Sequence, residues 1–277
     1  MDSLYLDVCN CCSRLITKRY STSFSLGIRV FNKKYRMPIY AIYGFVRFAD
    51  EIVDTFHDKN KGELLSRFRE ETFRAIREGI SLNPVLQSFQ VVVNEYGIED
   101  ELITAFLDSM EMDLYNQVYD HDSLDRYIYG SAEVVGLMCL RVFCPDNEEY
   151  QRLKPFACSL GSAFQKINFL RDMKSDYEER GRTYFPEIDF HNFTNVDKER
   201  IETEIKEEFD HAYEGIKQLP KGVRFGVYLA YRYYTSLFQK IKGFSPKKIT
   251  EERIRINNRR KIYLLGKCAL RNSLNML

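Results

Sequence analysis

Apolar residues recur at three- and four-residue spacing along almost the whole chain, whereas runs that alternate like a strand are scarce. This spacing places apolar side chains on one face of a helix. It predicts helices near residues 3–18, 37–57, 62–79, 84–95, 98–118, 122–143, 147–178, 198–217, 221–242 and 249–272. The longest stretch without this period, 181–195, is expected to be a loop over a functional opening. We therefore expect an all-α fold and a single domain over residues 1–277, because a helical core can grow to this length without splitting.

The charge of the chain argues against nucleic acid as a partner, because 41 basic and 40 acidic residues leave a net charge of only +1. The charge is unevenly distributed, and residues 241–277 carry ten Lys or Arg but only two Glu. This basic tail is a candidate surface for a ligand diphosphate or for anionic lipid headgroups at a membrane surface. A solvated helix face explains the same charges equally well.

The cysteines and the apolar runs indicate in which compartment of the cell the protein is found. Seven scattered cysteines in a chain of this size favour a reducing compartment. The N-terminus has neither the basic start nor the apolar stretch of a signal peptide. The longest strongly apolar run, residues 37–46, is far shorter than the ~20 residues that a membrane helix needs. We expect a monomeric, cytoplasmic protein whose contact with the membrane is peripheral.

A stripe of polar residues lies in one of the most apolar of the expected helices, in the sequence YGFVRFADEIVDTFH. The residues that project from one side at 100° per residue are Tyr43, Arg47, Asp50, Asp54 and His57. Asp50 and Asp54 are one turn apart, so their carboxylates can reach shared hard cations, which prefer oxygen ligands. Magnesium is the natural occupant, because it bridges a few carboxylates to substrate phosphates.

A second polar stripe lies in the sequence FQKINFLRDMKSDYEERGRTYFP. Its members follow at steps of three, four and four residues and are Gln165, Asn168, Asp172 and Asp176. A lone DxxxD is most often solvated surface. Two of them, both within aromatic and aliphatic sequence, predict facing carboxylate pairs that hold a metal and diphosphate between them.

Five blocks along the chain have a recognisable pattern: YSTSFSLG at 20–27, RFADEIVD at 47–54, YIYGSAEVVG at 127–136, FQKINFLRDMKSDYEERGRTYFP at 164–186 and AYRYYTSLF at 230–238. In these blocks, which span nearly the whole chain, the sequence resembles the squalene and phytoene synthases, the head-to-head class of trans-isoprenyl diphosphate synthases. The resemblance implies the isoprenoid-synthase fold, a helical bundle around a central cavity.

The same resemblance implies a role for each block. Magnesium, or manganese in its place, would be bound by Asp50, Asp54, Asn168, Asp172 and Asp176. The substrate diphosphates would contact Ser21, Arg47 and Tyr234, with Arg171, Tyr184 and Arg259 near the leaving group and Gln165 supporting the second metal cluster. The hydrocarbon chains would lie against Phe24, Tyr129, Gly130 and Val134. Glu133 departs from the family, which more usually has a small residue there.

The implied reaction makes an allylic carbocation and a diphosphate anion, so the site must stabilise both and exclude water. Metal and arginines would hold the anion. Desolvated aromatic faces stabilise a cation by ~1–2 kcal/mol each, and the candidates are Phe24, Tyr43 and Tyr129. We count Tyr129 among the catalytic residues together with the four aspartates.

By resemblance, two prenyl diphosphates combine through a cyclopropylcarbinyl diphosphate. We expect two geranylgeranyl diphosphates to give phytoene, as in carotenoid biosynthesis. Two farnesyl diphosphates giving dehydrosqualene or squalene remain an alternative, as do a single-substrate terpene cyclase and a non-catalytic assembly factor. We expect NADPH to be dispensable, because a cation in a sealed aromatic cavity loses a proton when no hydride donor is docked.

Overall fold

The structure is a computed structural model that describes residues 3–115 and 118–273, and the side chains of these except at 22–23, 258–260, 262 and 270–273. Its helices are α1 (Ser3–Tyr20), α2 (Thr22–Arg29), α3 (Lys33–Asp54), α4 (Lys61–Glu78), α5 (Pro84–Tyr96), α6 (Asp100–Tyr115), α7 (His121–Ile128), the π-helical turn η1 (Tyr129–Glu133), α8 (Val134–Phe143), α9 (Asn147–Arg180), the 3₁₀ turn η2 (Phe190–Asn192), α10 (Asn195–Gln218), α11 (Lys221–Lys242), α12 (Pro246–Glu251) and α13 (Asn258–Ser273). These residues contain no strand, only an isolated bridge between Val118 and Thr183. The prediction of an all-α fold is confirmed.

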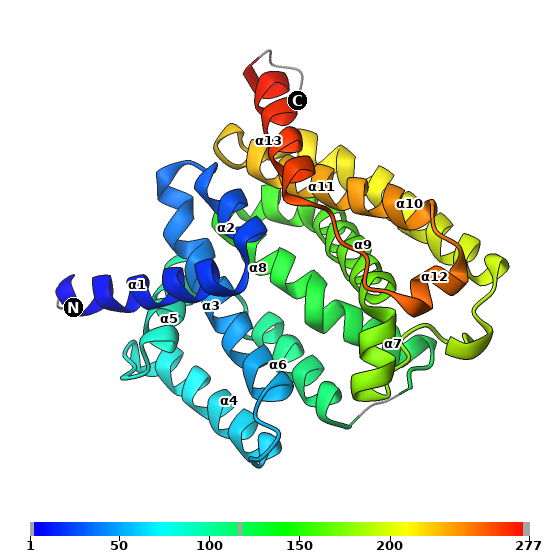
Figure 1. The fold of residues 1–277 in the computed structure, drawn as a ribbon. Helices are drawn as coiled ribbons and strands as arrows, with labels where there is room; N and C mark the ends of the chain where they lie inside the picture. The colour runs from blue at the N-terminus through cyan, green and yellow to red at the C-terminus, as the bar shows by residue number, and fades with distance from the viewer. Residues whose placement is uncertain (1–2, 116–117, 274–277) are drawn as a thin grey trace.

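The helices form one packed bundle (Figure 1). The first helices gather around α3, which packs against α1, α5, α6 and α8. The later helices gather around α9, which packs against α10, α11 and α12, while α13 lies on α11. The long α9 also packs against α8 and η1, so it joins the two halves of the bundle.

Two clusters of buried side chains form the core. In the first core cluster, built mainly from α3, α5, α6 and α8, the rings of Phe45 and Phe89 stack with their centres 3.9 Å apart. In the second, built mainly from α7, α9, α10 and α11, the rings of Phe169 and Tyr184 stack at 4.0 Å. Each cluster buries the apolar face of its helices and leaves the polar stripes of α3 and α9 free to meet between the halves.

Several helix boundaries differ from those that the apolar spacing predicts. Helix α2 was not expected, and it forms because the Ser21 hydroxyl caps it by accepting a hydrogen bond from the Phe24 amide at 3.2 Å. Helix α3 begins at Lys33 rather than 37, because Asn32 caps it, and Pro38 therefore lies inside the helix instead of at its start. The caps are local side-chain hydrogen bonds, which the spacing of the apolar residues does not predict.

Two expected helices are divided in the structure. The expected helix 122–143 becomes α7, η1 and α8. The expected helix 249–272 is split by an extended segment, 252–257, which is held against α9 by a hydrogen bond from the Ile254 amide to the Arg171 carbonyl at 3.4 Å. The expected loop 181–195 is irregular apart from η2 and the first residue of α10. In the part of the chain described here, no helix is both long enough and apolar enough to cross a bilayer.

Candidate active site

The acidic stripe of α3 is partly exposed while the opposite face of the same helix is buried. The side chains of Asp50 and Asp54 are 32% and 28% exposed, whereas Phe45 and Ala49 are fully buried. Arg47 lies on the same stripe, with its Nη1 3.6 Å from Asp50 Oδ2. The apolar face therefore anchors α3 in the first core cluster and turns both carboxylates toward α9.

The acidic stripe of α9 is more deeply placed. The side chains of Asp172 and Asp176 are 15% and 12% exposed. Asp172 accepts a hydrogen bond from Arg171 Nε at 3.0 Å and lies 2.6 Å from Arg253 Nε, which reaches it from the extended segment 252–257. The basic tail thus supplies a cation to the site.

One arginine joins the two stripes. Arg180 Nη2 lies 3.2 Å from Asp54 Oδ1, and its Nη1 lies 3.3 Å from Asp176 Oδ1. Gly181, at φ 65°, ends α9 in the left-handed region, where glycine has no steric penalty, and the chain turns away after Arg180. Arg180 thus brings one aspartate of each stripe, Asp54 and Asp176, within reach of a single side chain.

A fifth aspartate belongs to the site and was not identified from the sequence. Asp113 of α6 lies 2.9 Å from Arg182 Nη1 and accepts a hydrogen bond from the Tyr127 hydroxyl at 3.0 Å, and its side chain is only 7% exposed. It continues the buried stripe of Phe106 and Met110 at helical spacing, and a carboxylate on an apolar stripe is the signal that could have found it.

Burial raises the pKa values of three carboxylates of the site, and neighbouring carboxylates add to this effect. Burial, and then the nearby charges of Asp54 and Asp113, raise the pKa of Asp50 to about 7 against the opposing effect of Arg47. Burial also raises the pKa values of Asp113 and Asp176 to about 6, although Arg182 and Arg180 oppose it. Burial therefore disfavours the charged forms of these carboxylates, and a cation bound beside them would favour those forms.

The oxygen ligands of the site suit magnesium better than they suit a metal ion that protein ligands alone must surround. Among the described residues, no three His, Cys, Asp or Glu side chains are grouped closely enough to hold a metal ion by themselves. Magnesium does not need such a group, because it binds one or two carboxylates together with water and substrate phosphates. Asp50 and Asp54 on one helix, and Asp172 and Asp176 on the other, provide such pairs of oxygen ligands.

A chain of hydrogen bonds runs beside the second stripe. Tyr234 of α11 donates to Asn168 Oδ1 at 3.2 Å, Asn168 donates to Gln165 Oε1 at 3.2 Å, and Gln165 donates to the Ser131 hydroxyl of η1 at 3.2 Å. The Tyr234 ring stacks on Phe164 at 3.8 Å. This chain fixes the orientation of the Asn168 amide, and it brings Gln165, Asn168 and Tyr234 together as expected.

The residues expected from the first block lie against the α3 stripe. The rings of Phe24 and Tyr43 stack at 4.6 Å, and the Tyr43 hydroxyl is hydrogen-bonded to Ser21. Burial raises the pKa of Tyr43, and the charges of Asp50 and Arg47 also act on it. An aromatic pair therefore lies within electrostatic reach of the carboxylates.

The block around η1 is buried more deeply than a cavity lining requires. Val134 is fully buried in the first core cluster, and Tyr129 packs against that cluster. A Cβ on Gly130 would lie 2.4 Å from the Ala105 carbonyl oxygen, so this glycine permits η1 to pack closely on α6. Glu133 points to a different region, where burial raises its pKa and Cys158 is its hydrogen-bond partner.

Of the remaining expected contacts, Tyr184 lies near the second stripe, where the charges of Asp113 and Asp176 act on it, and the side chain of Arg259 lies outside the described residues. Tyr184 is buried in the second core cluster, with Arg182 Nη1 3.5 Å from its hydroxyl. Arg259 itself lies in α13. Arg180, Arg182 and Arg253 were not assigned from the sequence, although the two arginines flanking Gly181 directly after the second stripe were a usable signal.

Comparison with known proteins gives a consistent result. The family model for squalene/phytoene synthase matches residues 17–260. The phytoene synthase of Arthrospira platensis is 28% identical over 256 residues, which are 83% of this chain and 82% of that protein. The 4,4'-diapophytoene synthase of Staphylococcus haemolyticus is 27% identical over 68% of this chain and 65% of its own length. The presqualene diphosphate synthase of Sinorhizobium fredii is 31% identical over 65% of this chain and 64% of its own length. A crystal structure of a dehydrosqualene synthase has the same fold, with a TM-score of 0.82, 21% identity and 98% of both chains covered.

Proposed function

Because the chain belongs to the squalene/phytoene synthase family, we propose that it is a magnesium-dependent prenyl transferase that joins two prenyl diphosphates head to head. The observation that carries the proposal is the meeting of two DxxxD stripes, where Arg180 joins Asp54 to Asp176. A diphosphate placed between α3 and α9 would face carboxylates from both helices. A single acidic stripe would leave one side of that position without ligands.

Magnesium, when bound, would neutralise the charge of the leaving diphosphate. The residues that we propose hold it, or manganese in its place, are Asp50, Asp54, Asn168, Asp172 and Asp176. The raised pKa values of Asp50 and Asp176 support this assignment, because a cation stabilises the charged form of a carboxylate whose surroundings disfavour that form.

The chain's own cations would hold and orient the anion. Arg47 has a buried Nε without a hydrogen-bond partner among the described residues, so it has a donor to offer. Arg171 and Arg253 both lie on Asp172. We propose that these arginines turn from carboxylate to diphosphate oxygens when substrate enters, since arginine pairs with either in the same geometry.

The aromatic pair Phe24 and Tyr43 is placed to stabilise the allylic cation that remains after the C–O bond of the donor breaks. Its rings stack beside Ser21 and within electrostatic reach of Asp50. The double bond of the acceptor then attacks this cation, and loss of a proton closes the ring to give a cyclopropylcarbinyl diphosphate. Ionisation of this second diphosphate, rearrangement and loss of a second proton complete the reaction.

We propose that the released diphosphate, rather than a tyrosine, takes the final proton. Burial raises the pKa values of Tyr43, Tyr129 and Tyr234, so each phenol keeps its proton at neutral pH. A neutral phenol donates hydrogen bonds well and accepts a proton poorly. The diphosphate is the stronger base left in the site.

For the substrate, we propose two geranylgeranyl diphosphates and phytoene as the product. The support is the phytoene synthase of Arthrospira platensis, which matches along 83% of the chain. Two farnesyl diphosphates are the second candidate, because a diapophytoene synthase and a dehydrosqualene synthase are also among its relatives and structural neighbours. We propose further that NADPH is not required. A non-catalytic role is disfavoured, because crowding buried carboxylates together is unfavourable unless a cation is bound.

The test is incubation with labelled geranylgeranyl or farnesyl diphosphate and magnesium, followed by extraction and mass spectrometry of the hydrocarbon. The wild-type chain should give a forty-carbon product from the first substrate. Asp50→Asn and Asp172→Asn should each keep the circular dichroism of the wild type and lose about a hundredfold or more in turnover, because each removes charge from the metal site without changing shape.

The matched control is Asp210→Asn on α10, whose side chain is 64% exposed and forms an ion pair with Lys206. It should leave turnover unchanged. Near-normal turnover of both site variants would refute the metal assignment, and no hydrocarbon from the wild type with either substrate would refute the proposed function.

A further inference from the structure

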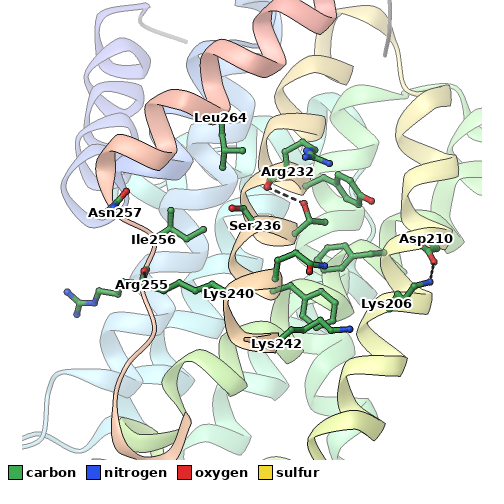
Figure 2. A pocket seen from close by; sticks show the side chains of 15 residues that line it. Lys206, Asp210, Arg232, Ser236, Lys240, Lys242, Arg255, Ile256, Asn257 and Leu264 are labelled. Atoms are coloured by element: carbon green, nitrogen blue, oxygen red, sulfur yellow. Dashed lines mark hydrogen bonds and ion pairs between the residues drawn. The ribbon is translucent and has the colours of Figure 1, made fainter. Parts of the chain in front are cut away.

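A cavity of about 750 Å³ lies on the side of α11 that faces α10 and the segment leading into α13 (Figure 2). Its volume is within the range of small-molecule sites. It is distinct from the acidic site, because Tyr234 points to Asn168 on α9 while Arg232, two residues earlier and about 200° around the helix, lines the cavity. None of the proposed metal ligands borders it.

The walls of the cavity carry more positive than negative charge. The basic residues that line it are Lys206, Arg232, Lys240, Lys242 and Arg255, and among the described residues Asp210 is the one acidic residue of the lining. Lys206 is paired with Asp210 at 2.6 Å, and Lys240 donates to the Arg255 carbonyl at 2.7 Å. No carboxylate of the described residues lies within ion-pair distance of Arg232. An uncompensated guanidinium in a hollow is an anion-binding feature.

Figure 2 shows how the cations are distributed. Arg232 lies near Leu264 at one end of the cavity and Lys242 lies at the other, while the guanidinium of Arg255 points away from it. Lys242 approaches Glu202 only to 4.0 Å. Arg232 and Lys242 are therefore the cations best placed to act on a ligand from both ends.

Part of the cavity lining is apolar. The apolar lining residues are deeply buried and are Phe209, Phe238, Ile256 and Leu264. A small inorganic anion would contact the cations and leave these apolar side chains uncovered. An amphiphile would use both, since its charged head meets the cations and its first carbons cover the rings.

We propose that this cavity binds the phosphate-bearing head and the adjoining carbons of an amphiphile, with the phosphate oxygens paired to Arg232 and with Lys242 adding positive charge from the other end. The ligand can come from two sources, an anionic membrane lipid or a phosphate amphiphile free in solution. The proposal does not depend on the prenyl transferase activity, because the cavity shares no residue with the acidic site.

The test compares a cavity variant, Arg232→Gln/Lys242→Gln, with a control, Lys217→Gln/Lys221→Gln. The control removes two exposed cations that do not line the cavity, one at the end of α10 and one at the start of α11, so both variants lose the same charge. The soluble probe is dodecyl phosphate in EDTA, which keeps any divalent metal from contributing. The membrane probe is sedimentation with phosphatidylcholine vesicles that contain or lack phosphatidylglycerol.

The cavity variant should weaken binding by about tenfold or more, because each charge-assisted hydrogen bond contributes about 1.5–3 kcal/mol, and the control should bind as the wild type does. If the cavity variant loses binding to dodecyl phosphate, the ligand is a soluble amphiphile. If it loses binding only to vesicles that contain phosphatidylglycerol, the ligand is a lipid headgroup. Equal loss in both variants, or no wild-type binding to either probe, overturns the proposal. Lys242→Gln alone, at an exposed position, repeats the comparison if the double variant is unstable.

Discussion

The close packing of η1 between α6 and α9 should make Gly130→Ala strongly destabilising. A Cβ at this position would lie 2.4 Å from the Ala105 carbonyl oxygen and 2.7 Å from Ser109 Cβ. Ordinary contacts of this kind are about 3.5 Å, so one helix must move by about 1 Å. The nearest obstacle is a backbone carbonyl within α6, which cannot rotate away as a flexible side chain can.

The expected magnitude follows from two opposing terms. Overpacking of this kind costs about 1–3 kcal/mol, and the rigid neighbour argues for the upper end. Alanine regains about 1 kcal/mol over glycine in a helix. The net loss in the free energy of unfolding is therefore about 2 kcal/mol, and the melting temperature should fall by about 4–8 °C.

Thermal unfolding by circular dichroism measures this loss, and Gly136→Ala is the matched control. Gly136 lies in α8, and an added Cβ would meet only the Ala157 carbonyl, at an ordinary 3.5 Å. The control should be as stable as the wild type or slightly more so. If Gly130→Ala behaved like Gly136→Ala, the close approach of η1 to α6 would be wrong. Turnover should also fall in Gly130→Ala, because η1 carries Ser131 at the end of the hydrogen-bond chain.

Three further outcomes are expected. The folded-state pKa values of Asp50, Asp113 and Asp176 are raised, so the folded protein holds protons that the unfolded chain releases. The stability of the metal-free protein should therefore fall as pH rises from about 4 through 7. Magnesium should reduce this fall, and a stability that does not change with pH in the absence of metal would contradict the burial of these acids. Tyr234→Phe should keep the ring stacked on Phe164 but lose the hydrogen bond to Asn168. It should lower the free energy of unfolding in urea by about 1 kcal/mol and also lower turnover. Unchanged turnover would show that this chain of hydrogen bonds has no part in the reaction. Adding NADPH should not change the mass of the hydrocarbon, and a product two hydrogens richer would show a reductive synthase.

The sequence predicts the helices and the two acidic stripes because both are local patterns. Residues 221–242 form a helix in the structure, as expected. The helix expected at 147–178 is also present, and it ends two residues later, at Arg180. Asp50 and Asp54, like Asp172 and Asp176, share a helix face through spacing alone. No contact with another helix is needed to place them.

Helix ends were harder to predict, because they depend on a single hydrogen bond or on packing. Ser21 starts α2, and Asn32 starts α3 ahead of Pro38. The break after α12 depends on Ile254 being held against α9. The spacing of apolar residues does not predict these contacts.

Only the tertiary structure decided which distant residues complete the site. Asp113 comes from α6, and Arg253 comes from a segment that the apolar spacing had placed within a helix. Their partners, Arg182 and Asp172, are far from them in the chain, and each pair forms because tertiary packing places an irregular segment against a helix. Helical spacing determines which side chains share one face of one helix. Which faces then meet, and with what balance of charge, depends on long-range packing that no local pattern in this sequence specifies.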